Sequence, residues 1–252
     1  MTQRVLPRSA IDEFDTPEGV AEQLQHFKSL LGFNVHSVFS VLDVGGGTGF
    51  FVSALKAEFP HGDATILDLD EASVIKGMNL GLTAIHGSII EPPAAILSRK
   101  FDVISFNLVL HHIIGDTDSS TVDLQRRALC QACTLLTNGG RLFVHEICYE
   151  GRLVPDSSAL LIYQISSSRR FSRALRFVGK ISPALRSNTA GIGVRFRPAS
   201  GWVSLAGTLG LQVIGACEGG PEGHSLLRKT LLLIREVRRC SLVLRPVNGK
   251  TL

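Results

Sequence analysis

A glycine-rich run over residues 43–49 is the strongest chemical signal in the sequence. It reads DVGGGTG, follows an apolar segment typical of a strand and precedes a helical segment. Glycines at such a junction let the backbone turn sharply and approach a ligand, and the first turn of the next helix offers unpaired N–H groups. We expect a ligand above this loop, outside the carboxyl end of a parallel sheet. The fingerprint G-x-G-x-x-G of dinucleotide sites is not met, because Phe50 or Phe51 stands where its last glycine would fall.

An acidic residue follows at the distance expected for a nucleoside site. Asp68 ends the second strand-like segment and lies 19 residues beyond Gly49. A carboxylate there can accept hydrogen bonds from both ribose hydroxyls. Asp70 is the competing position, but we expect it to cap the helix that begins at Glu71, because aspartate is favoured there.

The glycine run resembles motif I of class I S-adenosylmethionine-dependent methyltransferases, written E/D-x-G-x-G-x-G. The resemblance implies that Asp43 organises the loop around the amino-acid end of S-adenosylmethionine, and that Leu69 flanks the adenine. The segment from His86 to Ile90 is similar to the part of the family that contacts the adenine edge, with Ser88 where aspartate is common. The implied cofactor-binding residues are Asp43, Gly45, Gly46, Gly47, Gly49, Asp68, Leu69, Ser88, Ile89, Asn107 and Leu108.

Two later segments extend the resemblance. The run from Asn107 to His112, NLVLHH, resembles motif IV of small-molecule members, and residues 138–144 match the family's lead into its fifth strand, with Asn138 replacing proline. The resemblance covers residues 36–146 closely and 199–236 by pattern. It implies a methyl transfer to a small-molecule acceptor with release of S-adenosylhomocysteine, and it leaves the methylated atom, O, N, S or C, open.

Methyl transfer is an in-line displacement, so the protein must align the acceptor and, for a hydroxyl or thiol, remove its proton. His111 and His112 follow the fourth strand, and His145 and Glu146 end the fifth. Strand alternation sends only one of the latter pair into the site. We list His111, His112 and Glu146 as catalytic candidates and expect a histidine to be the base; the alternative is that the histidines only hold their loop.

These residues need strands that end at one edge of a sheet, and the chain supplies them. Short apolar runs alternate with helical stretches, which indicates βαβ units. The predicted fold class is α/β: a doubly wound, seven-stranded, mostly parallel sheet with an antiparallel edge strand and a helical cap insert after the fifth strand. Strands are expected at 38–43, 64–67, 83–86, 101–106, 141–146, 211–217 and 226–236, and helices near 49–58, 71–78, 121–136 and 199–209.

The predicted organisation is one cofactor-binding core with attached segments. The core comprises residues 36–147 and 199–237. An N-terminal helical segment over 1–35 is expected to cover the site, a basic cap over 148–198 to hold the acceptor, and a loosely attached tail to follow from 238 to 252.

Charge is distributed unevenly. Residues 1–125 carry a net charge of −9 and residues 126–252 carry +13. Arg169, Arg173, Arg176 and Lys180 form one stripe of a predicted helix, which either packs on the domain or contacts a membrane surface or an acidic or amphiphilic acceptor. With 6% aromatic residues, nucleic acid is a minor alternative, as is a non-catalytic cofactor-binding scaffold.

Other classes are disfavoured. No run approaches the roughly 18 apolar residues of a membrane-spanning helix, and residues 1–15 lack a cleavable leader pattern, so we expect a cytoplasmic protein. The five cysteines form no disulfide framework. Cys130 and Cys133 lack a second pair, so no metal site is expected.

Overall fold

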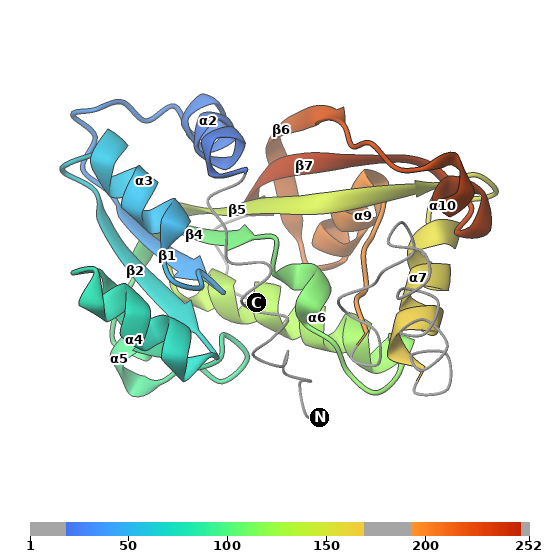
Figure 1. The fold of residues 1–252 in the computed structure, drawn as a ribbon. Coiled ribbons are helices and arrows are strands. Elements are labelled where there is room, and N and C mark those ends of the chain that lie inside the picture. The colour runs from blue at the N-terminus through green and yellow to red at the C-terminus, as the bar shows by residue number, and fades with distance from the viewer. Residues whose placement is uncertain (1–18, 169–192, 248–252) are drawn as a thin grey trace.

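A seven-stranded sheet runs through the centre of the molecule (Figure 1), and the computed structural model describes residues 19–168 and 193–247. Its strand order is β3-β2-β1-β4-β5-β7-β6. The strands are β1 (Ser40–Val44), β2 (Asp63–Asp68), β3 (Thr83–His86), β4 (Phe101–Asn107), β5 (Leu136–Gly151), β6 (Leu211–Pro221) and β7 (Ile234–Pro246). The first five strands run parallel, whereas β7 pairs antiparallel with both β5 and β6.

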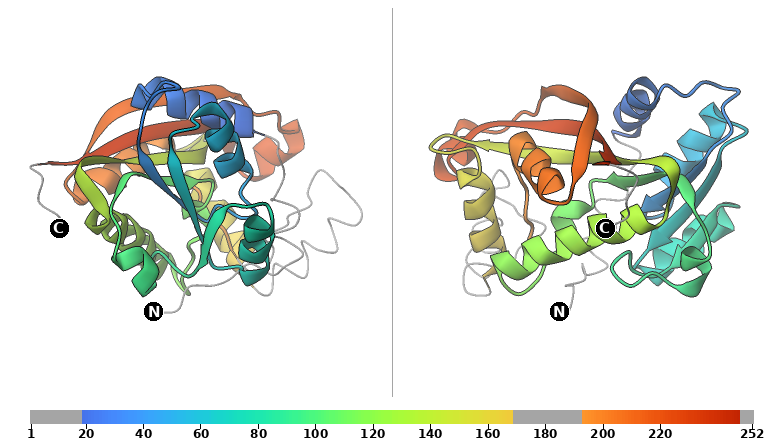
Figure 2. Two further views of the ribbon diagram at one scale, coloured as in Figure 1. Left: turned by 90° about the vertical axis from the view of Figure 1, so that its left-hand side faces the viewer. Right: turned by 180° about the vertical axis from the view of Figure 1, so that it is seen from behind.

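Helices cover both faces of the sheet and connect its strands. They are α2 (Val20–Leu31), α3 (Phe50–Glu58), α4 (Glu71–Asn79), α5 (Ala94–Leu97), α6 (Asp118–Thr134), α7 (Ser157–Ser167), α9 (Ala199–Thr208) and α10 (Leu226–Leu231), with the 3-10 turn η1 at Leu110–His112. In the left view of Figure 2, α2 lies above the sheet and α6 below it. None of the described helices is long and apolar enough to cross a membrane.

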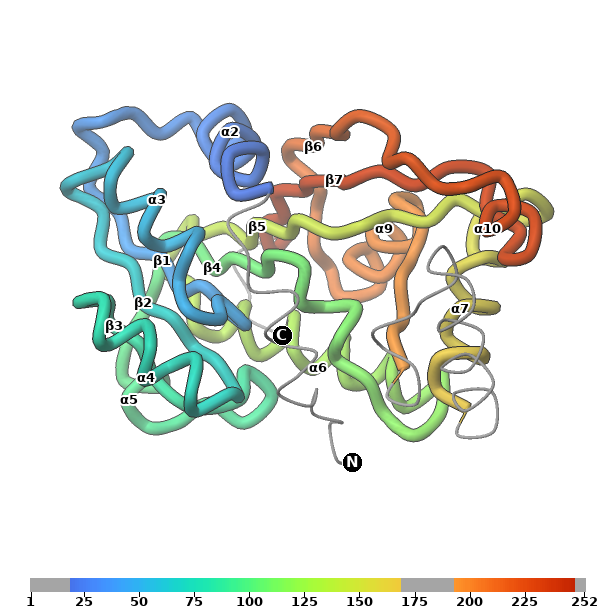
Figure 3. Tube along the Cα trace, in the orientation of Figure 1, coloured from blue at the N-terminus to red at the C-terminus, as the bar shows by residue number. Residues whose placement is uncertain are grey.

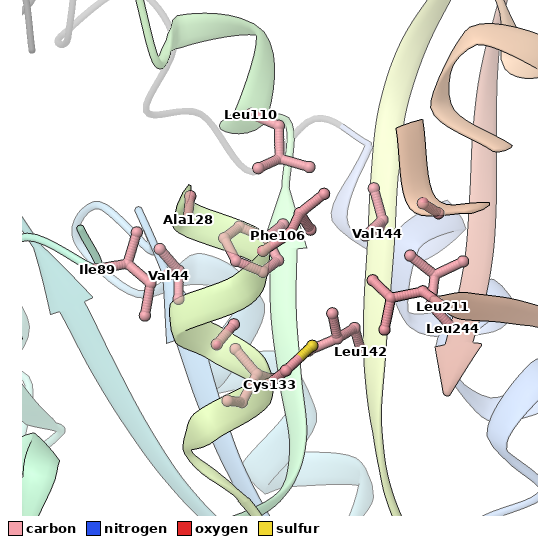
Figure 4. Close-up of a cluster of buried hydrophobic side chains, with 14 of the residues drawn as sticks. Val44, Ile89, Phe106, Leu110, Ala128, Cys133, Leu142, Val144, Leu211 and Leu244 are labelled. Atoms are coloured by element: carbon pink, nitrogen blue, oxygen red, sulfur yellow. The ribbon is translucent and has the colours of Figure 1, made fainter. Parts of the chain in front are cut away.

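Each face of the sheet has its own apolar core. On the α2 and α3 side, Phe27 and Phe51 pack against Phe143 of β5. On the opposite side, helices α6 and α9 cover a larger cluster in which Phe106, Leu142 and Val144 of the sheet are buried (Figure 4). Strands buried on both faces read as continuous apolar runs, which is why β1 and β4 could be recognised from the sequence.

Strands β5 and β7 are the longest in the sheet, and they pair from Leu142 and Leu244 to Gly151 and Ile234. Figure 3 shows them running side by side to α10, at the end of the molecule away from β3. The carboxyl ends of β1 to β4 and the adjoining part of β5 therefore meet at one edge, where the predicted ligand site lies.

The predicted fold class is confirmed: the sheet is doubly wound, an antiparallel pair closes its far side, and α7 forms a helical insert after β5. Of the closing pair, β6 is the outermost strand and β7 is the one that runs against its neighbours. Every strand predicted from β1 to β6 is present, and β3 has the predicted bounds.

The prediction for the last strand was wrong. Residues 226–231 form helix α10, and β7 begins only at Ile234. A short leucine-rich run does not distinguish a buried strand from a helix by periodicity, and here Ser225 caps the helix by accepting a hydrogen bond from the Arg228 N–H at 3.3 Å.

Residues 238–246, expected as part of a loosely attached tail, are instead strand β7. Their arginines had suggested solvent exposure. In the structure Arg239 pairs with Glu22 of α2 at 3.4 Å and with Glu222 at 3.0 Å, and Arg238 pairs with Glu218 and Glu236. Strand β5 is likewise longer than predicted, since it includes the expected turn at 138–140 and continues beyond Glu146 to Gly151.

The division into core, cap and terminal segments stays a prediction. Helix α2 represents the N-terminal segment among the described residues, and it packs on α3, β6 and β7. The predicted basic helix over 169–180 lies outside the described residues.

Candidate active site

The glycine loop closes tightly over the end of β1. Gly45, Gly47 and Gly49 have φ values of 69°, 55° and 92°, a region that side-chain-bearing residues rarely adopt. A Cβ on Gly45 would lie 2.3 Å from Cγ2 of Val109, and a Cβ on Gly49 would lie 2.4 Å from Cδ1 of Leu82. The loop therefore presents backbone, without side chains, at the edge of the sheet.

Asp43 lies fully buried beneath this loop. Its Oδ1 accepts hydrogen bonds from Oγ of Ser105 at 2.6 Å and from Nδ2 of Asn107 at 2.8 Å. Its Oδ2 has no hydrogen-bond partner among the described residues, and it lies 2.7 Å from where a Cβ of Gly46 would stand. Burial raises the pKa of Asp43 to about 6, against the two hydrogen bonds that lower it. A cationic ligand group near this carboxylate would offset part of its desolvation.

Asp68 joins the glycine loop to the end of β2. Its carboxylate accepts hydrogen bonds from the N–H of Gly47 at 2.9 Å and of Asp70 at 2.7 Å. Asp70 caps helix α4, as predicted, by accepting a hydrogen bond from the N–H of Ser73 at 2.8 Å. The two carboxylates therefore have different surroundings, and only that of Asp68 is hydrogen-bonded to the loop.

The other predicted cofactor residues lie at the same edge, because β3, β2, β1 and β4 are neighbours. Ser88 follows β3, and Leu69 follows β2. Asn107 ends β4, and the next residue, Leu108, has a φ of 55° while its N–H donates to the carbonyl of His145 at 2.7 Å. Backbone strain at a bulky residue is found where surrounding structure enforces it, often at functional sites. The Ile89 side chain is buried in the core.

A buried histidine–carboxylate pair lies next to this edge. The turn η1 brings His111 against β5, where its Nδ1 is hydrogen-bonded to Oε2 of Glu146. The other carboxylate oxygen, Oε1, accepts the N–H of Leu110 at 2.6 Å. Because a carboxylate only accepts, Nδ1 of His111 carries the proton and a neutral ring has its lone pair on Nε2.

The other two histidines near the pair are in different situations. The ring of His112 lies 4.1 Å from that of His111, and burial together with His111 lowers its pKa well below the ordinary value. His145 points to the opposite face of the sheet, where its Nδ1 lies 2.7 Å from Oγ of Ser241. Strand alternation thus sends Glu146, and not His145, toward the catalytic candidates.

Sequence reasoning missed the residue that holds this turn from behind. Gln125 of α6 is fully buried, and its Nε2 donates to the carbonyl of Leu110 at 3.0 Å. Its Oε1 accepts from Nε and Nη2 of Arg197 at 3.0 and 2.8 Å. No local pattern indicates this role, since a glutamine within a helix is usually solvent-exposed.

Arg195 anchors the segment that returns beside the turn. Its N–H donates to the carbonyl of His111 at 2.9 Å. Its guanidinium binds Asp156 through both terminal nitrogens, at 2.9 and 2.6 Å, and Asp118 through Nε at 2.7 Å. The acidic groups that Arg195 was expected to reach are therefore the protein's own, at the starts of α6 and α7.

Comparison with known proteins supports the same interpretation. A family model described as "Methyltransferase domain" matches residues 13–213. The chain is similar to 3-hydroxy-5-methyl-1-naphthoate 3-O-methyltransferase of Streptomyces sahachiroi, with 25% identity over 150 residues that cover 56% of this chain and 41% of that enzyme. The chain thus matches less than half of that relative's length.

Solved structures show the same fold. The mitomycin 7-O-methyltransferase MmcR aligns with a TM-score of 0.55 and 19% identity over 91% of this chain and 54% of that chain. The N-methyltransferase NodS of Bradyrhizobium japonicum, in complex with S-adenosylhomocysteine, aligns with a TM-score of 0.54 and 14% identity over 92% of this chain and 90% of that chain. Because O- and N-methylating enzymes share this fold, the fold alone does not determine the acceptor atom.

Proposed function

Since the chain belongs to the methyltransferase domain family, we propose that it transfers the methyl group of S-adenosylmethionine to a hydroxyl oxygen of a small-molecule acceptor. The observation that carries the choice of oxygen is the buried contact between His111 and Glu146. A hydroxyl must lose its proton to become a strong nucleophile, and a histidine held by a carboxylate is suited to remove it.

The edge of the sheet fits S-adenosylmethionine. The Oδ2 of Asp43, which has no hydrogen-bond partner among the described residues, suits the ammonium of the methionine part. The glycine backbone leaves room for the ligand beside it, and Asp68 offers acceptor oxygens for ribose hydroxyls. We propose Leu69, Ser88, Ile89, Asn107 and Leu108 as the remaining contacts. Bound there, the cofactor would supply an electrophilic methyl carbon.

In this proposal, His111 is the general base and Glu146 is a positioning residue. Nε2 of His111 takes the hydroxyl proton, while Glu146 keeps Nδ1 protonated and stabilises the positive charge that the ring acquires. His112 is the weaker candidate, because its pKa is lowered well below the ordinary value by burial and by the neighbouring His111. Glu146 has both oxygens engaged within the protein, by His111 and by the N–H of Leu110.

The acceptor is proposed to be a small molecule with a hydroxyl on an aromatic ring. The naphthoate-methylating relative supports this choice. So does the environment of His111, whose ring stacks on Phe196 at 4.7 Å, while Phe196 in turn lies 4.5 Å from the ring of Tyr149. Aromatic rings favour offset or tilted packing against other rings, so this row suits a planar acceptor.

The test is an acceptor screen with S-adenosylmethionine that carries an isotopically labelled methyl group. The full chain is incubated with matched hydroxyl, amine and thiol acceptors built on one- and two-ring aromatic compounds, and products are identified by mass. We expect a labelled methyl ether and equal amounts of S-adenosylhomocysteine. Calorimetry that shows binding of NAD but not of S-adenosylmethionine at millimolar concentration would overturn the cofactor. Labelling of amines alone, at a rate unchanged in His111→Ala, would overturn the oxygen acceptor.

A further inference from the structure

Five large aliphatic side chains are exposed together where β5 and β7 end. We call residues 151–155 and 224–235 the β5–β7 tip. The exposed side chains are Leu153, Val154, Leu226, Leu227 and Leu231, and each is between 53% and 75% exposed. Helix α10 within the tip has no buried residue, so its leucines do not serve the core. Clustered exposed apolar side chains of this size mark a surface that another phase or molecule covers.

The two segments of the tip form one continuous surface. The N–H of Arg152 donates to the carbonyl of Leu233 at 2.8 Å, and its Nε donates to the carbonyl of Ile234 at 3.2 Å. Gly151 pairs with Ile234 as the last contact between β5 and β7. Figure 3 shows the end of β5 and α10 next to each other at this end of the molecule. The turn that carries Leu153 and Val154 is therefore tied to the residues that directly follow α10.

The charges in the tip all have one sign. It contains Arg152, Arg228, Lys229 and Arg235, and no aspartate or glutamate occurs in either segment. Arg235 lies 3.5 Å from Glu150, just outside the tip, and its side chain remains 65% exposed. Long basic side chains beside exposed leucines can place their charges at the level of lipid headgroups while the leucines enter the apolar layer.

Charge complementarity selects the occupant. A second copy docked through the same surface would bring four cations against four cations. The chain's own segment 169–192 contains six basic residues and no acidic one, so it would also be repelled. An anionic lipid surface attracts the cations and accepts the leucines.

We propose that the β5–β7 tip docks this protein on anionic membranes as a peripheral, reversible contact. The leucines of α10 and the turn at 153–154 enter the headgroup region, and the four basic side chains bind lipid phosphates. The inference goes beyond methyl transfer and does not depend on it. Anchoring by a few aliphatic side chains is weak by itself, so both the apolar and the charged parts are required.

The experiment measures sedimentation of the full chain with vesicles of phosphatidylcholine and with vesicles of phosphatidylcholine mixed with phosphatidylglycerol. We expect binding only to the anionic vesicles, and weaker binding as salt is raised. Leu226→Ser combined with Leu227→Ser should weaken binding by about tenfold or more. The matched control combines Ile75→Ser with Met78→Ser on α4, where both side chains are also more than half exposed, and should bind as the unchanged protein does. Thermal melts verify that both variants are folded.

A second measurement does not depend on removing the leucines. In Leu226→Trp, anionic vesicles should shift the added emission to shorter wavelength, while Leu80→Trp, at an exposed position on the other side of the sheet, should show no shift. The proposal fails if neither vesicle type binds, or if the serine variant of α10 binds undiminished. It also fails if Arg173→Gln with Arg176→Gln alone abolishes binding, or if the α10 leucines instead prove to hold a dimer together in light scattering.

Discussion

His111 carries the chemistry at the scale of single residues. General-base assistance contributes about 10²–10⁴-fold, so His111→Ala should lower kcat by about that factor. Affinity for S-adenosylmethionine in calorimetry should stay within a few fold, because His111 follows β4 and is not part of the glycine loop. Glu146→Gln should lower kcat less than His111→Ala does, since the amide can still hold the ring but cannot stabilise its charge.

His112→Ala is the control for this prediction. Its ring touches that of His111, so it tests whether loss of any ring in the turn is enough. We expect a loss of kcat well under tenfold. If His112→Ala cost as much as His111→Ala, or if neither change reduced turnover, a base at His111 would be excluded.

Asp68 and Asp70 differ in their roles although they are two residues apart. Asp68→Ala should weaken cofactor binding by about 1–3 kcal/mol, because a charge-assisted acceptor for ribose is lost. Asp70→Ala should leave the affinity nearly unchanged and lower the free energy of unfolding by about 1 kcal/mol, because helix α4 loses its cap. Calorimetry and urea unfolding of both variants separate the two effects, and a reversed order of affinities would show that the ribose ligand has been misassigned.

At the scale of elements, Gln125 connects helix α6 to the catalytic turn. Gln125→Leu removes the hydrogen bond to the carbonyl of Leu110 and leaves the buried Arg197 without this acceptor. We expect kcat to fall about tenfold and the free energy of unfolding to fall by about 1–3 kcal/mol. Gln131→Leu is the matched control on the same helix, because Gln131 bonds only within the helix, to Thr134, and it should change neither quantity.

A conservative change separates positioning from stability. In Gln125→Glu the carboxylate still accepts from Arg197 but cannot donate to Leu110. We therefore expect Gln125→Glu to recover stability relative to Gln125→Leu and to keep the lowered kcat. Recovery of both quantities together would indicate that Gln125 acts only through stability.

At the scale of the whole molecule, His145 links β5 to β7 and α2. Its Nδ1 lies 2.7 Å from Oγ of Ser241, to which Nδ1 of His26 is also hydrogen-bonded at 2.8 Å. Burial, together with the nearby His26 and Arg239, lowers the pKa of His145 from 6.5 to about 3. Between these values the unfolded chain binds a proton that the folded protein does not, so acid destabilises the fold by up to about 1.4 kcal/mol per pH unit.

His145→Gln should reduce this dependence, because glutamine can bond Ser241 without titrating. Urea unfolding followed by the fluorescence of Trp202 at several pH values from neutral to about 4 measures the slopes of both proteins. Asp43, whose pKa is raised to about 6, acts in the opposite direction in this range, but it is present in both. Equal slopes would rule out His145 as a source of acid sensitivity.

Local patterns in the sequence determined the cofactor edge. The glycine run with Asp43, the acid Asp68 after the next strand and the short apolar runs predicted strands β1 to β4 and their shared edge. They could do so because these features depend on residues close in sequence: a glycine needed for a left-handed turn, a cap such as Asp70, or a strand buried on both faces.

Tertiary structure alone decided how the catalytic candidates relate. That Glu146 meets His111, that Gln125 and Arg195 hold the turn, and that Arg238 and Arg239 belong to a strand all depend on contacts between residues far apart in the chain. The same is true of α10, because whether a leucine run such as 226–231 becomes helix or strand depends on what packs against it. Such pairings are stabilised only once the sheet has formed and buried them, so no local pattern encodes them.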